Sequence, residues 1–552
     1  MRGNDMKLNY KRTIFVGFAF FLICTFWQAY DNTIPLILTN KFGLSQTASG
    51  IIMALDNILA LFMLPLFGAI SDRRNSRLGK RTPFILVGTI AAAILFVALF
   101  FADNAQLKSL STAAAIDDPQ ALELIYEKEA DAALMTPDAD AFVLSQTFTK
   151  EEFCAIPSQI VRSGDGVYTV DGAPYALADR FTETERKDLQ KHEEDKAFTN
   201  PHYTDFVVPA RQAYAASVTH AHPQTLIVFI VLLLLLLVAM AIFRSPAVAL
   251  MPDVTIKPLR SKGNAVINLM GSAGGILVLV LGMVFSTSAV KNSMMSYTVY
   301  FSVIAGIMLL ALALFLWQVR EPRFVREMQE QSRALGIEED EPETGGSKKK
   351  LSRSERRSLC FLLASIVLWF MGYNAVTSKY SVYASNILNK DYNLTMMIAQ
   401  AAAIAAYLPV GMISSKVGRK KTILAGVAML TASFVTACFL RASSPTWLMN
   451  SMFALAGIGW ATINVNSFPM VVEMCRDGDV GKYTGIYYTA SMAAQTVTPM
   501  LSGYFMDKLG MRSLFPYASI FVALAFVTML FVMHGDSRPL AKTGLEALDV
   551  DN

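Results

Sequence analysis

The sequence predicts an all-α polytopic membrane protein, with twelve transmembrane helices in two six-helix halves and a small α+β insertion between helices 3 and 4. Three observations lead to this prediction. Hydrophobic residues make up 53% of the 552 residues and charged residues only 17%, a composition typical of a membrane protein and not of a soluble domain. Apolar runs of about twenty residues, long enough to cross a bilayer as a helix, recur along the chain. A basic hinge between two such runs occurs twice.

The basic hinge sets the orientation of the chain. Its first copy, GAISDRRNSRLGKRTPF at residues 68–84, contains five cations, which the positive-inside rule assigns to the cytoplasmic side. A shorter copy, GMISSKVGRKKTILAG at residues 411–426, repeats the order of Gly, Ser, cations, and Gly with paired cations. We therefore expect a duplicated core in the cell membrane, with cytoplasmic N- and C-termini. The basic start of the chain leads into a span too long for a signal-peptide core, so we expect no cleaved signal.

Residues 102–224 interrupt the pattern of spans. They contain no apolar run of span length, but they carry the start signals of soluble helices. Asp118 followed by Pro119 is typical of an N-cap with proline at the first helical position. Residues 149–152 and 182–185 each have the spacing of a capping box. With short strands around glycine-containing turns, the segment is predicted to be an acidic α+β insertion on the outer face.

The internal repeat measures the insertion independently. Gly68 in the first half corresponds to Gly411 in the second, whereas Asp253 corresponds to Glu473. The spacing between the two copies therefore shrinks by about 123 residues, close to the length of the insertion. We infer that the insertion was added to one half of a symmetric core.

The remaining boundaries follow from the apolar runs and the charged stretches between them. In the first half, spans are expected at residues 13–38, 46–70, 82–101, 225–250, 262–285 and 297–319. In the second half, spans are expected to begin near Leu359, Leu394, Thr422, Trp447, Gly481 and Leu514. The stretch of mixed charge between the halves is predicted to be a mobile cytoplasmic linker. The resulting divisions are 1–101 (helices 1 to 3), 102–224 (insertion), 225–320 (helices 4 to 6), 321–357 (linker), 358–535 (second half) and 536–552 (cytoplasmic tail).

The hinge resembles a known family, the major facilitator superfamily. That family carries a Gly, then an Asp with a cation, and then a Gly with paired cations between helices 2 and 3. The corresponding residues here are Gly68, Asp72, Arg73, Gly79, Lys80 and Arg81, with a longer gap before Gly79 than in the common form. The variant SDR-x-x-SR-x-GKR-x-PF resembles the glycoside-pentoside-hexuronide:cation symporters and the group of plant sucrose and animal proton-sugar transporters. RSPAVALMPD at residues 244–253 and GKYTGIYYTASMAAQTVTP at residues 481–499 are similar to the same branch. The resemblance implies a secondary active transporter that moves a sugar or glycoside by H⁺ or Na⁺ symport with alternating access.

Ionisable side chains inside the spans indicate a coupling site, because each costs several kcal/mol, from about 2.5 upward. Asp56, with Asn57, is expected near mid-membrane in helix 2, and Asp31 at a similar depth in helix 1. Two carboxylates on adjacent helices can share a proton or hold Na⁺ between carboxylate and amide oxygens. The alternatives are a structural hydrogen bond from Asp56 and simple exposure of Asp31 to water. We expect no cofactor besides the coupling ion, H⁺ or Na⁺.

Amides and aromatic rings inside the spans are the candidates for solute binding. In helix 1 they surround Asp31, and in the second half they fall within helices 7, 10 and 11. They are Trp27, Gln28, Asp31, Asn32, Tyr373, Asn374, Trp460, Asn464 and Gln495. As a set they favour a neutral polyol over a hydrophobic drug, although any one of them is as compatible with helix packing.

The hinge acids and cations are expected to form a cytoplasmic gate between the halves. The resemblance implies that Asp72 lies near the N-terminus of helix 11, whose dipole attracts a carboxylate. The expected gate residues are Asp72, Arg73, Arg77, Arg81, Asp253 and Glu473. The alternative is that these cations only set topology. Arg244 in helix 4 is predicted to pair with an acid, line the inner vestibule or snorkel to the interface, and Lys379 is predicted to be an extracellular-rim charge.

Other function classes have little support in the sequence. We find no glycine-rich phosphate loop, nucleophile elbow or catalytic-triad spacing, so neither an ATP-driven pump nor an enzyme is expected. The net charge of +4 combines a basic cytoplasmic face with an acidic insertion, so nucleic acid is not an expected partner; we expect a monomer in the lipid bilayer. No metal site or disulfide framework is expected, because the cysteines lack ligand spacing. Two alternatives stay open: an exporter or carrier of lipid-like or drug-like solutes, and a non-transporting sensor with a ligand-binding outer domain.

Overall fold

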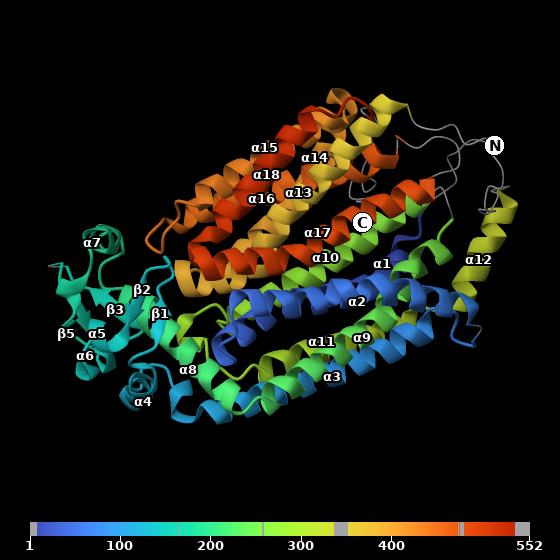
Figure 1. Ribbon diagram of the computed structural model, residues 1–552. Helices are drawn as coiled ribbons and strands as arrows, with labels where there is room; N and C mark the ends of the chain where they lie inside the picture. The colour runs from blue at the N-terminus through green and yellow to red at the C-terminus, as the bar shows by residue number, and fades with distance from the viewer. Residues whose placement is uncertain are drawn as a thin grey trace.

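The computed structural model is a bundle of long helices with a small mixed domain at one end (Figure 1). It describes residues 8–74, 76–164, 166–256, 259–335, 352–472, 474 and 480–535. The expected tail at 536–552 and residues 336–351 of the expected linker lie outside the described residues. We call the end with the mixed domain the insertion end, and the opposite end, where α12 (Glu321–Ala334) lies, the α12 end.

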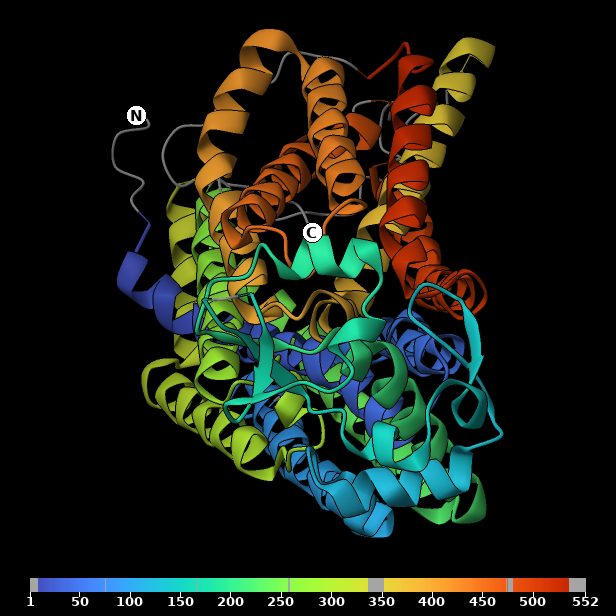
Figure 2. The ribbon, with the colours of Figure 1, turned by 90° about the vertical axis from the view of Figure 1, so that its left-hand side faces the viewer.

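Twelve long helices of the described chain form the two halves, which Figure 2 shows from the insertion end. The first half consists of α1 (Tyr10–Leu36), α2 (Gln46–Arg73), α3 (Thr82–Leu110), α9 (Gln224–Val254), α10 (Arg260–Val284) and α11 (Thr298–Gln318). The second half consists of α13 (Arg353–Tyr383), α14 (Tyr392–Val417), α15 (Arg419–Ala437), α16 (Thr446–Val472), α17 (Val480–Leu509) and α18 (Leu514–Leu530). Within the described chain, nine helices are long and apolar enough to cross a membrane, and α14, α15 and α17 pack against them. The predicted fold class is confirmed.

The two halves repeat each other in local detail at the insertion end. The first helix of each half ends there in a π-helical turn, η1 (Ile37–Lys41) after α1 and η7 (Ala384–Leu388) after α13. The second helix of each half then begins with a side-chain cap. Ser45 accepts a hydrogen bond from Ala48 N at the start of α2, and Asp391 accepts one from Asn393 N at the start of α14. Such caps satisfy backbone N–H groups that the first helical turn leaves unpaired.

Each half packs around its own aromatic core. In the first half, the rings of Phe100 in α3 and Phe301 in α11 stack with centroids 3.6 Å apart. In the second half, Tyr383 of α13 meets Phe515 of α18 edge to face. Large apolar side chains instead cover the outside of the bundle, as expected where helices face lipid.

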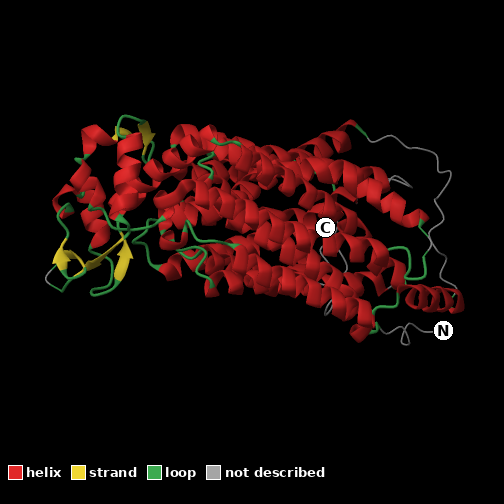
Figure 3. Cartoon of the chain, turned by 90° about the horizontal axis from the view of Figure 1, so that it is seen from below, coloured by secondary structure: helices red, strands yellow, loops and turns green. Residues whose placement is uncertain are grey.

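The insertion between α3 and α9 is a small α+β domain with its own buried core, and its strands lie at one end of the molecule (Figure 3). Its strands are β1 (Ala133–Met135), β2 (Ala141–Val143), β3 (Gln159–Arg162), β4 (Tyr168–Val170), β5 (Ala173–Pro174) and β6 (Ala197–Thr199). β1 and β2 form a hairpin, and the others form an antiparallel sheet in the order β5-β4-β3-β6. Its helical segments are η2 (Ser111–Ala114), α4 (Pro119–Glu129), α5 (Leu144–Thr147), α6 (Lys150–Cys154), η3 (Ala178–Arg180), α7 (Glu183–Leu189), η4 (Tyr203–Val207) and α8 (Val208–Ala221).

The helix-start signals in the insertion form the caps that the sequence predicts. Asp118 caps α4, and both capping boxes form, at the starts of α6 and α7. The boundary with helix 3 differs, because α3 continues to Leu110 beyond its expected end at residue 101. Its last turns are held by Asp103, which pairs with Lys41 of η1 inside the protein.

The first part of the expected linker is not a loose connector. It forms α12, whose first residue, Glu321, is buried against the hinge. The Glu321 carboxylate accepts hydrogen bonds from Lys80 N at 2.6 Å, Arg81 N at 2.9 Å and Thr82 N at 2.8 Å. A carboxylate at this position satisfies the free N–H groups and the dipole at the start of α3. The linker therefore begins as a fixed support for the hinge.

Candidate functional site

Three ionisable side chains lie within electrostatic range of one another in the first half. Asp31 of α1, Asp56 of α2 and Arg244 of α9 interact electrostatically with one another, and we call them the charged cluster. The Arg244 guanidinium lies over the ring of Trp27, with 5.3 Å between its carbon and the ring centroid. Asn57 Nδ2 donates a hydrogen bond of 2.8 Å to Asp56 Oδ1. Two carboxylates and one guanidinium leave a net negative charge, which one proton or one Na⁺ can neutralise.

Arg244 is a member of this cluster that the sequence left undecided. The structure places it within electrostatic range of the two acids, without a direct ion pair to either. The signal was present in the sequence, because a cation within an apolar helix needs a counter-charge, but the sequence does not say which helices are neighbours. Arg244 is positioned by α9, which packs against α2 and α1.

The second half offers neutral groups at the candidate positions. The rings of Tyr373 in α13 and Trp460 in α16 stack with centroids 3.6 Å apart and planes 1° apart. Asn374 adjoins the first ring in sequence, and Asn464 lies one helical turn after the second. Gln495 is half-buried in α17. Flat rings beside amides are suited to a solute that has both an apolar face and hydroxyl groups.

Three candidate side chains, and Tyr30 of α1, have unused hydrogen-bonding capacity. In the described part of the chain, Trp27 Nε1, Tyr30 OH, both polar atoms of the Asn32 side chain and Asn374 Nδ2 are buried without a hydrogen-bond partner. Buried polar groups are nearly always paired in folded proteins. A bound solute or water is therefore the natural partner for these atoms. Gln28 differs, because its Oε1 accepts a hydrogen bond of 2.5 Å from Gln400 Nε2 of the opposite half.

The halves are in contact at the insertion end. The Asp507 carboxylate at the end of α17 accepts hydrogen bonds of 2.8 Å from both Gln46 N and Thr47 N at the start of α2. Lys379 of α13 donates a hydrogen bond of 2.7 Å to the Gln46 carbonyl. Nearby, a Cβ on Gly50 would collide with the backbone carbonyl of Pro499, so α2 and α17 approach as closely as a glycine allows.

The prediction that Lys379 is a rim charge is wrong. Its side chain is fully buried, and it interacts electrostatically with Asp507. Burial of this charge depends on the docking of α13 against the start of α2 in the other half. A contact between distant segments of this kind leaves no mark on local sequence, so neither Lys379 nor Asp507 was identified as an interface residue.

The halves are separated at the α12 end. A cavity of about 580 Å³ lies between α17 and the C-terminal half of α2. It is lined by Ala60, Leu61, Leu64, Pro65, Gly68, Ala69, Asp72, Ser245, Tyr488, Thr489 and Met492. Ala60 lies one helical turn from Asp56, and Ser245 follows Arg244, so the cavity begins beside the charged cluster.

The expected gate residues are partly brought together, but within one half. Arg81 forms ion pairs with Asp72 and Asp253, the latter at 2.8 Å from its Nε. Arg73 and Arg77 are exposed. Glu473 lies outside the described residues. Asp72 thus meets a cation of its own hinge, and it lines the cavity that separates α2 from α17.

A buried ion pair at the insertion end was not anticipated. Lys41 Nζ lies 2.6 Å from Asp103 Oδ2, both side chains are fully buried, and Lys41 also donates to the Met295 carbonyl at 2.8 Å. The pair ties together η1, α3 and the segment before α11. It was missed because helix 3 was expected to end at residue 101, which assigned Asp103 to the soluble insertion. Among the described residues, no group of three or more His, Cys, Asp or Glu side chains is arranged to hold a metal ion.

Comparison with known proteins gives two family matches and a set of structural relatives. The family described as Major Facilitator Superfamily matches residues 210–400 and 385–548, and the family described as MFS/sugar transport protein matches residues 16–116.

Among solved structures, a D-xylose-proton symporter has a TM-score of 0.54 and 15% identity, covering 96% of this chain and 99% of that chain. The inward open xylose transporter XylE from E. coli has a TM-score of 0.51 and 14% identity, covering 95% and 97%. The nucleoside transporter NupG has a TM-score of 0.50 and 12% identity, covering 95% and 100%. At these identities the likeness shows the fold alone. A search of curated proteins found no match.

Proposed function

The chain belongs to the Major Facilitator Superfamily, and we propose from this premise that it is a secondary active transporter for a small polar solute, a sugar or glycoside, coupled to H⁺ or Na⁺. The observation that carries the proposal is the charged cluster, two acids and one arginine within membrane spans of the first half, together with the stacked rings of Tyr373 and Trp460 in the second half. We assign the chain to the branch of glycoside-pentoside-hexuronide:cation symporters and sucrose transporters on the hinge variant at residues 68–84.

Coupling in this proposal depends on the net negative charge of the cluster. Without a bound cation, the one positive charge of Arg244 offsets only one of the two negative charges nearby, and the other is uncompensated in a medium of low dielectric constant. Binding of H⁺ to Asp56 or Asp31, or of Na⁺ between Asp56 and Asn57, compensates that charge. Arg244 can then change its position over Trp27. Because Trp27 belongs to α1, which also carries the solute candidates Gln28 and Asn32, ion binding alters the proposed solute site.

Transport in this proposal occurs by rocking of the two halves. The present arrangement, closed at the insertion end and open at the α12 end, is the state open to the cytoplasm, with the insertion outside the cell membrane. In the opposite state, the cavity between α2 and α17 closes, and Asp72 exchanges its contact with Arg81 for one at the start of α17. The helix dipole at that position attracts a carboxylate.

One observation favours a second candidate, a carrier of lipid-like or drug-like solutes. The cavity at the α12 end is lined mainly by apolar side chains, among them Leu61, Leu64, Pro65 and Met492. A solute with an apolar tail can enter by this route with less loss of hydration free energy than a free sugar. The two candidates differ in the part of the solute that the protein recognises, which is the polar sugar group in the first and the apolar tail in the second.

The experiment is counterflow of labelled mono- and disaccharides in proteoliposomes, under imposed H⁺ or Na⁺ gradients, with alkyl glycosides as competitors. Wild type is compared with Asp56→Asn and with Asp179→Asn, an isosteric change at an exposed acid of the insertion. We expect uptake driven by one gradient, loss of the driven component in Asp56→Asn, and no effect of Asp179→Asn. Competition by the alkyl glycoside without exchange of any free sugar would establish the second candidate. Absence of exchange for every probe, with folded protein, would refute both.

A further inference from the structure

The insertion is attached to the first half by contacts as well as by the chain. It lies between α3 and α9, which both belong to that half. Its last helix, α8, packs on η1. Gln212 Nε2 of α8 donates a hydrogen bond of 3.0 Å to Asn40 Oδ1, and Gln106 Nε2 of α3 donates one of 3.0 Å to Thr219 Oγ1. These contacts are largely buried and fix the insertion to the first half.

The insertion also reaches the second half, by a smaller and more exposed contact. Asp138, in the turn between β1 and β2, lies 2.5 Å from Arg512 Nε, and the two side chains are 52% and 30% exposed. Gly510 adopts a positive φ of 87°, and a Cβ there would lie 2.7 Å from the Pro137 carbonyl. Only glycine therefore allows this turn to rest against the end of α17.

The remainder of this contact is incompletely packed. A cavity of about 80 Å³ lies between the insertion and the second half. The insertion contributes Glu185, Asp188, His192 and Asp205 to its lining, and the second half contributes Asn389, Arg441 and Arg512. A cavity of this size between charged side chains has room for water, so the contact can separate without exposing a dry apolar surface.

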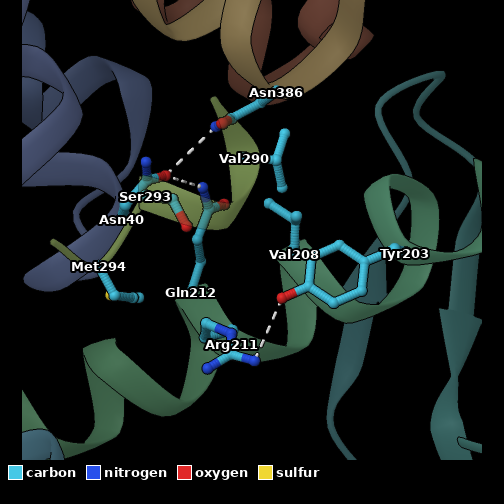
Figure 4. Close-up of a pocket in the computed structure, with 9 residues that line it drawn as sticks. All are labelled: Asn40, Tyr203, Val208, Arg211, Gln212, Val290, Ser293, Met294 and Asn386. Atoms are coloured by element: carbon cyan, nitrogen blue, oxygen red, sulfur yellow. Dashed lines mark hydrogen bonds between the residues drawn. The ribbon is translucent and has the colours of Figure 1, made fainter. Parts of the chain in front are cut away.

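The two kinds of contact meet at one residue, as Figure 4 shows. Asn40 Oδ1 of the first half accepts hydrogen bonds from Gln212 Nε2 of the insertion, at 3.0 Å, and from Asn386 Nδ2 of the second half, at 3.2 Å. The adjoining cavity is about 10 Å³, and its lining includes Arg211 and Tyr203 of the insertion. If the halves separate at this end, the bond from Asn386 breaks and the bond from Gln212 remains.

We propose that the insertion is an extracytoplasmic gating domain, which moves as one body with the first half and holds the second half in the state closed at the insertion end. This inference rests on the alternating access of the proposed function. The holding contact comprises the Asp138–Arg512 ion pair and the packing of Pro137 against Gly510; the hydrogen bond from Asn386 to Asn40 joins the two halves directly beside it. The polar and partly exposed character of the holding contact makes it weak and reversible, as a gate that opens in every cycle requires.

The test is a set of spin-label distances in the full chain, with the five native cysteines replaced by alanine. Single cysteines at the exposed positions Glu193 in the insertion, Lys291 in the first half and Trp447 in the second half carry the labels. The state open at the insertion end is favoured by Gly50→Trp, because any side chain there forces α2 away from Pro499. Gly503→Trp, at the facing position on α17, is the second opening variant.

The three distances separate the gating inference from the transport mechanism. We expect the 291–447 and 193–447 distances to lengthen together, while the 193–291 distance stays constant. A constant 193–447 distance with a longer 193–291 distance would overturn the inference, since the insertion would then move with the second half. A constant 291–447 distance in both opening variants would refute rocking itself, and with it the proposed function and this inference.

The strength of the holding contact is tested in the protein without the opening variants. With labels at Lys187 and Trp447, we expect Arg512→Ala to raise the population with the long 187–447 distance by about two- to fivefold, the range that an exposed ion pair supports. Lys196→Ala is the matched control, because that cation pairs only with Glu193 inside the insertion among the described contacts. Equal populations in Arg512→Ala and the control would overturn the holding role. Exchange of the two charges, Asp138→Arg with Arg512→Asp, is expected to restore the wild-type population.

Discussion

The centres of the two halves differ in charge, although the halves share one fold. In the first half, α1, α2 and α9 bring Asp31, Asp56 and Arg244 together. At the candidate positions of the second half, the side chains are aromatic rings and amides, with Tyr373 and Trp460 stacked. In the proposed function, this difference is a division of labour in which one half responds to the coupling ion and the other recognises the neutral solute.

The contacts across the middle and the closed end follow the same division. The Gln28–Gln400 hydrogen bond joins the halves through neutral amides. The charged residues Lys379 and Asp507 of the second half lie at the interface, where they bind the backbone at the start of α2. These charges of the second half contact the first half at the closed end, whereas the charged cluster lies among spans of the first half.

The largest effect is expected from Arg244→Met, which removes the cation of the first-half centre. Removing one partner from a buried set of charges costs about 3–5 kcal/mol, so we expect both driven uptake and exchange to fall by about 100-fold or more. Counterflow in proteoliposomes measures both. Arg353→Met, at an exposed arginine at the start of α13, is the control.

A folding defect is distinguished from a coupling defect by a second variant. Arg244→Met combined with Asp56→Asn leaves a single carboxylate, which can be protonated, and is expected to restore folded yield without restoring gradient-driven uptake. Normal coupling in Arg244→Met alone would show that the first half does not depend on its cation, and the division by charge would be wrong.

A smaller effect is expected from Trp460→Ala in the second half. Loss of the stacked ring removes up to about 1.5 kcal/mol of aromatic contact, so the solute affinity is expected to fall by up to about tenfold. The dependence of uptake on the ion gradient should stay unchanged, which is the feature that separates the halves. Trp460→Phe should retain most of the affinity, and Trp317→Ala, at a ring that is 73% exposed on α11, should have no effect. A changed ion dependence in Trp460→Ala would contradict the division.

The sequence was informative about elements and less informative about partners. Hydropathy and the repeated hinge predicted the twelve helices, and the pattern of N-caps predicted helices in the insertion that the structure contains. The cost of charge in a span drew attention to Asp31, Asp56 and Arg244. Which charges meet depends on helix packing between distant segments, as it does for Arg244 with Asp56 and for Lys379 with Gln46. Periodicity within one helix carries no record of such contacts.

Boundaries were the second source of error. Ending helix 3 at residue 101 placed Asp103 outside the membrane core, and so hid its pairing with Lys41. Treating residues 321–357 as a loose linker hid Glu321, which binds three backbone N–H groups of the hinge. In both cases a polar residue extends a structured region beyond the apolar run, and hydropathy alone cannot detect that extension.

A third effect, smaller again, is expected at the closed interface. Asp507→Asn weakens the cap on Gln46 N and Thr47 N, a kind of contact typically worth about 1 kcal/mol. The population open at the insertion end should therefore rise by about fivefold, measured as the share of long 291–447 label distances. Native Asp391 caps α14 at the corresponding place and accepts a hydrogen bond of 2.9 Å from Ser288 of the first half. The variant Asp391→Asn should raise the open population less than Asp507→Asn does. A population unchanged in Asp507→Asn would show that charge in the second half does not hold the gate.

A last effect, on stability and not on transport, concerns the insertion, the segment that only one half carries. Burial raises the pKa of Asp205 from 3.8 to about 7, reinforced by the nearby Glu185 and Asp138 and opposed by Arg512. Burial lowers the pKa of His202 from 6.5 to about 4, where its ring stacks on Phe181 with centroids 4.2 Å apart. The other charged side chains lining the cavity beside Asp205 are Asp188, His192 and Arg441.

These two groups give opposite pH dependences, and Asp205→Asn separates them. Between about pH 4 and about pH 7, native Asp205 holds a proton that the unfolded chain releases, so its contribution to stability is lost as pH rises. Native His202 is neutral where the unfolded chain is protonated, so its contribution is lost as pH falls toward 4. We expect the stability of Asp205→Asn relative to wild type to increase from pH 4 to pH 7, measured by hydrogen exchange of the β3 amides corrected for intrinsic rates. Asp179→Asn should show no such trend. A pH-independent difference would mean that Asp205 titrates normally, and that the contact between the insertion and the second half is open to water.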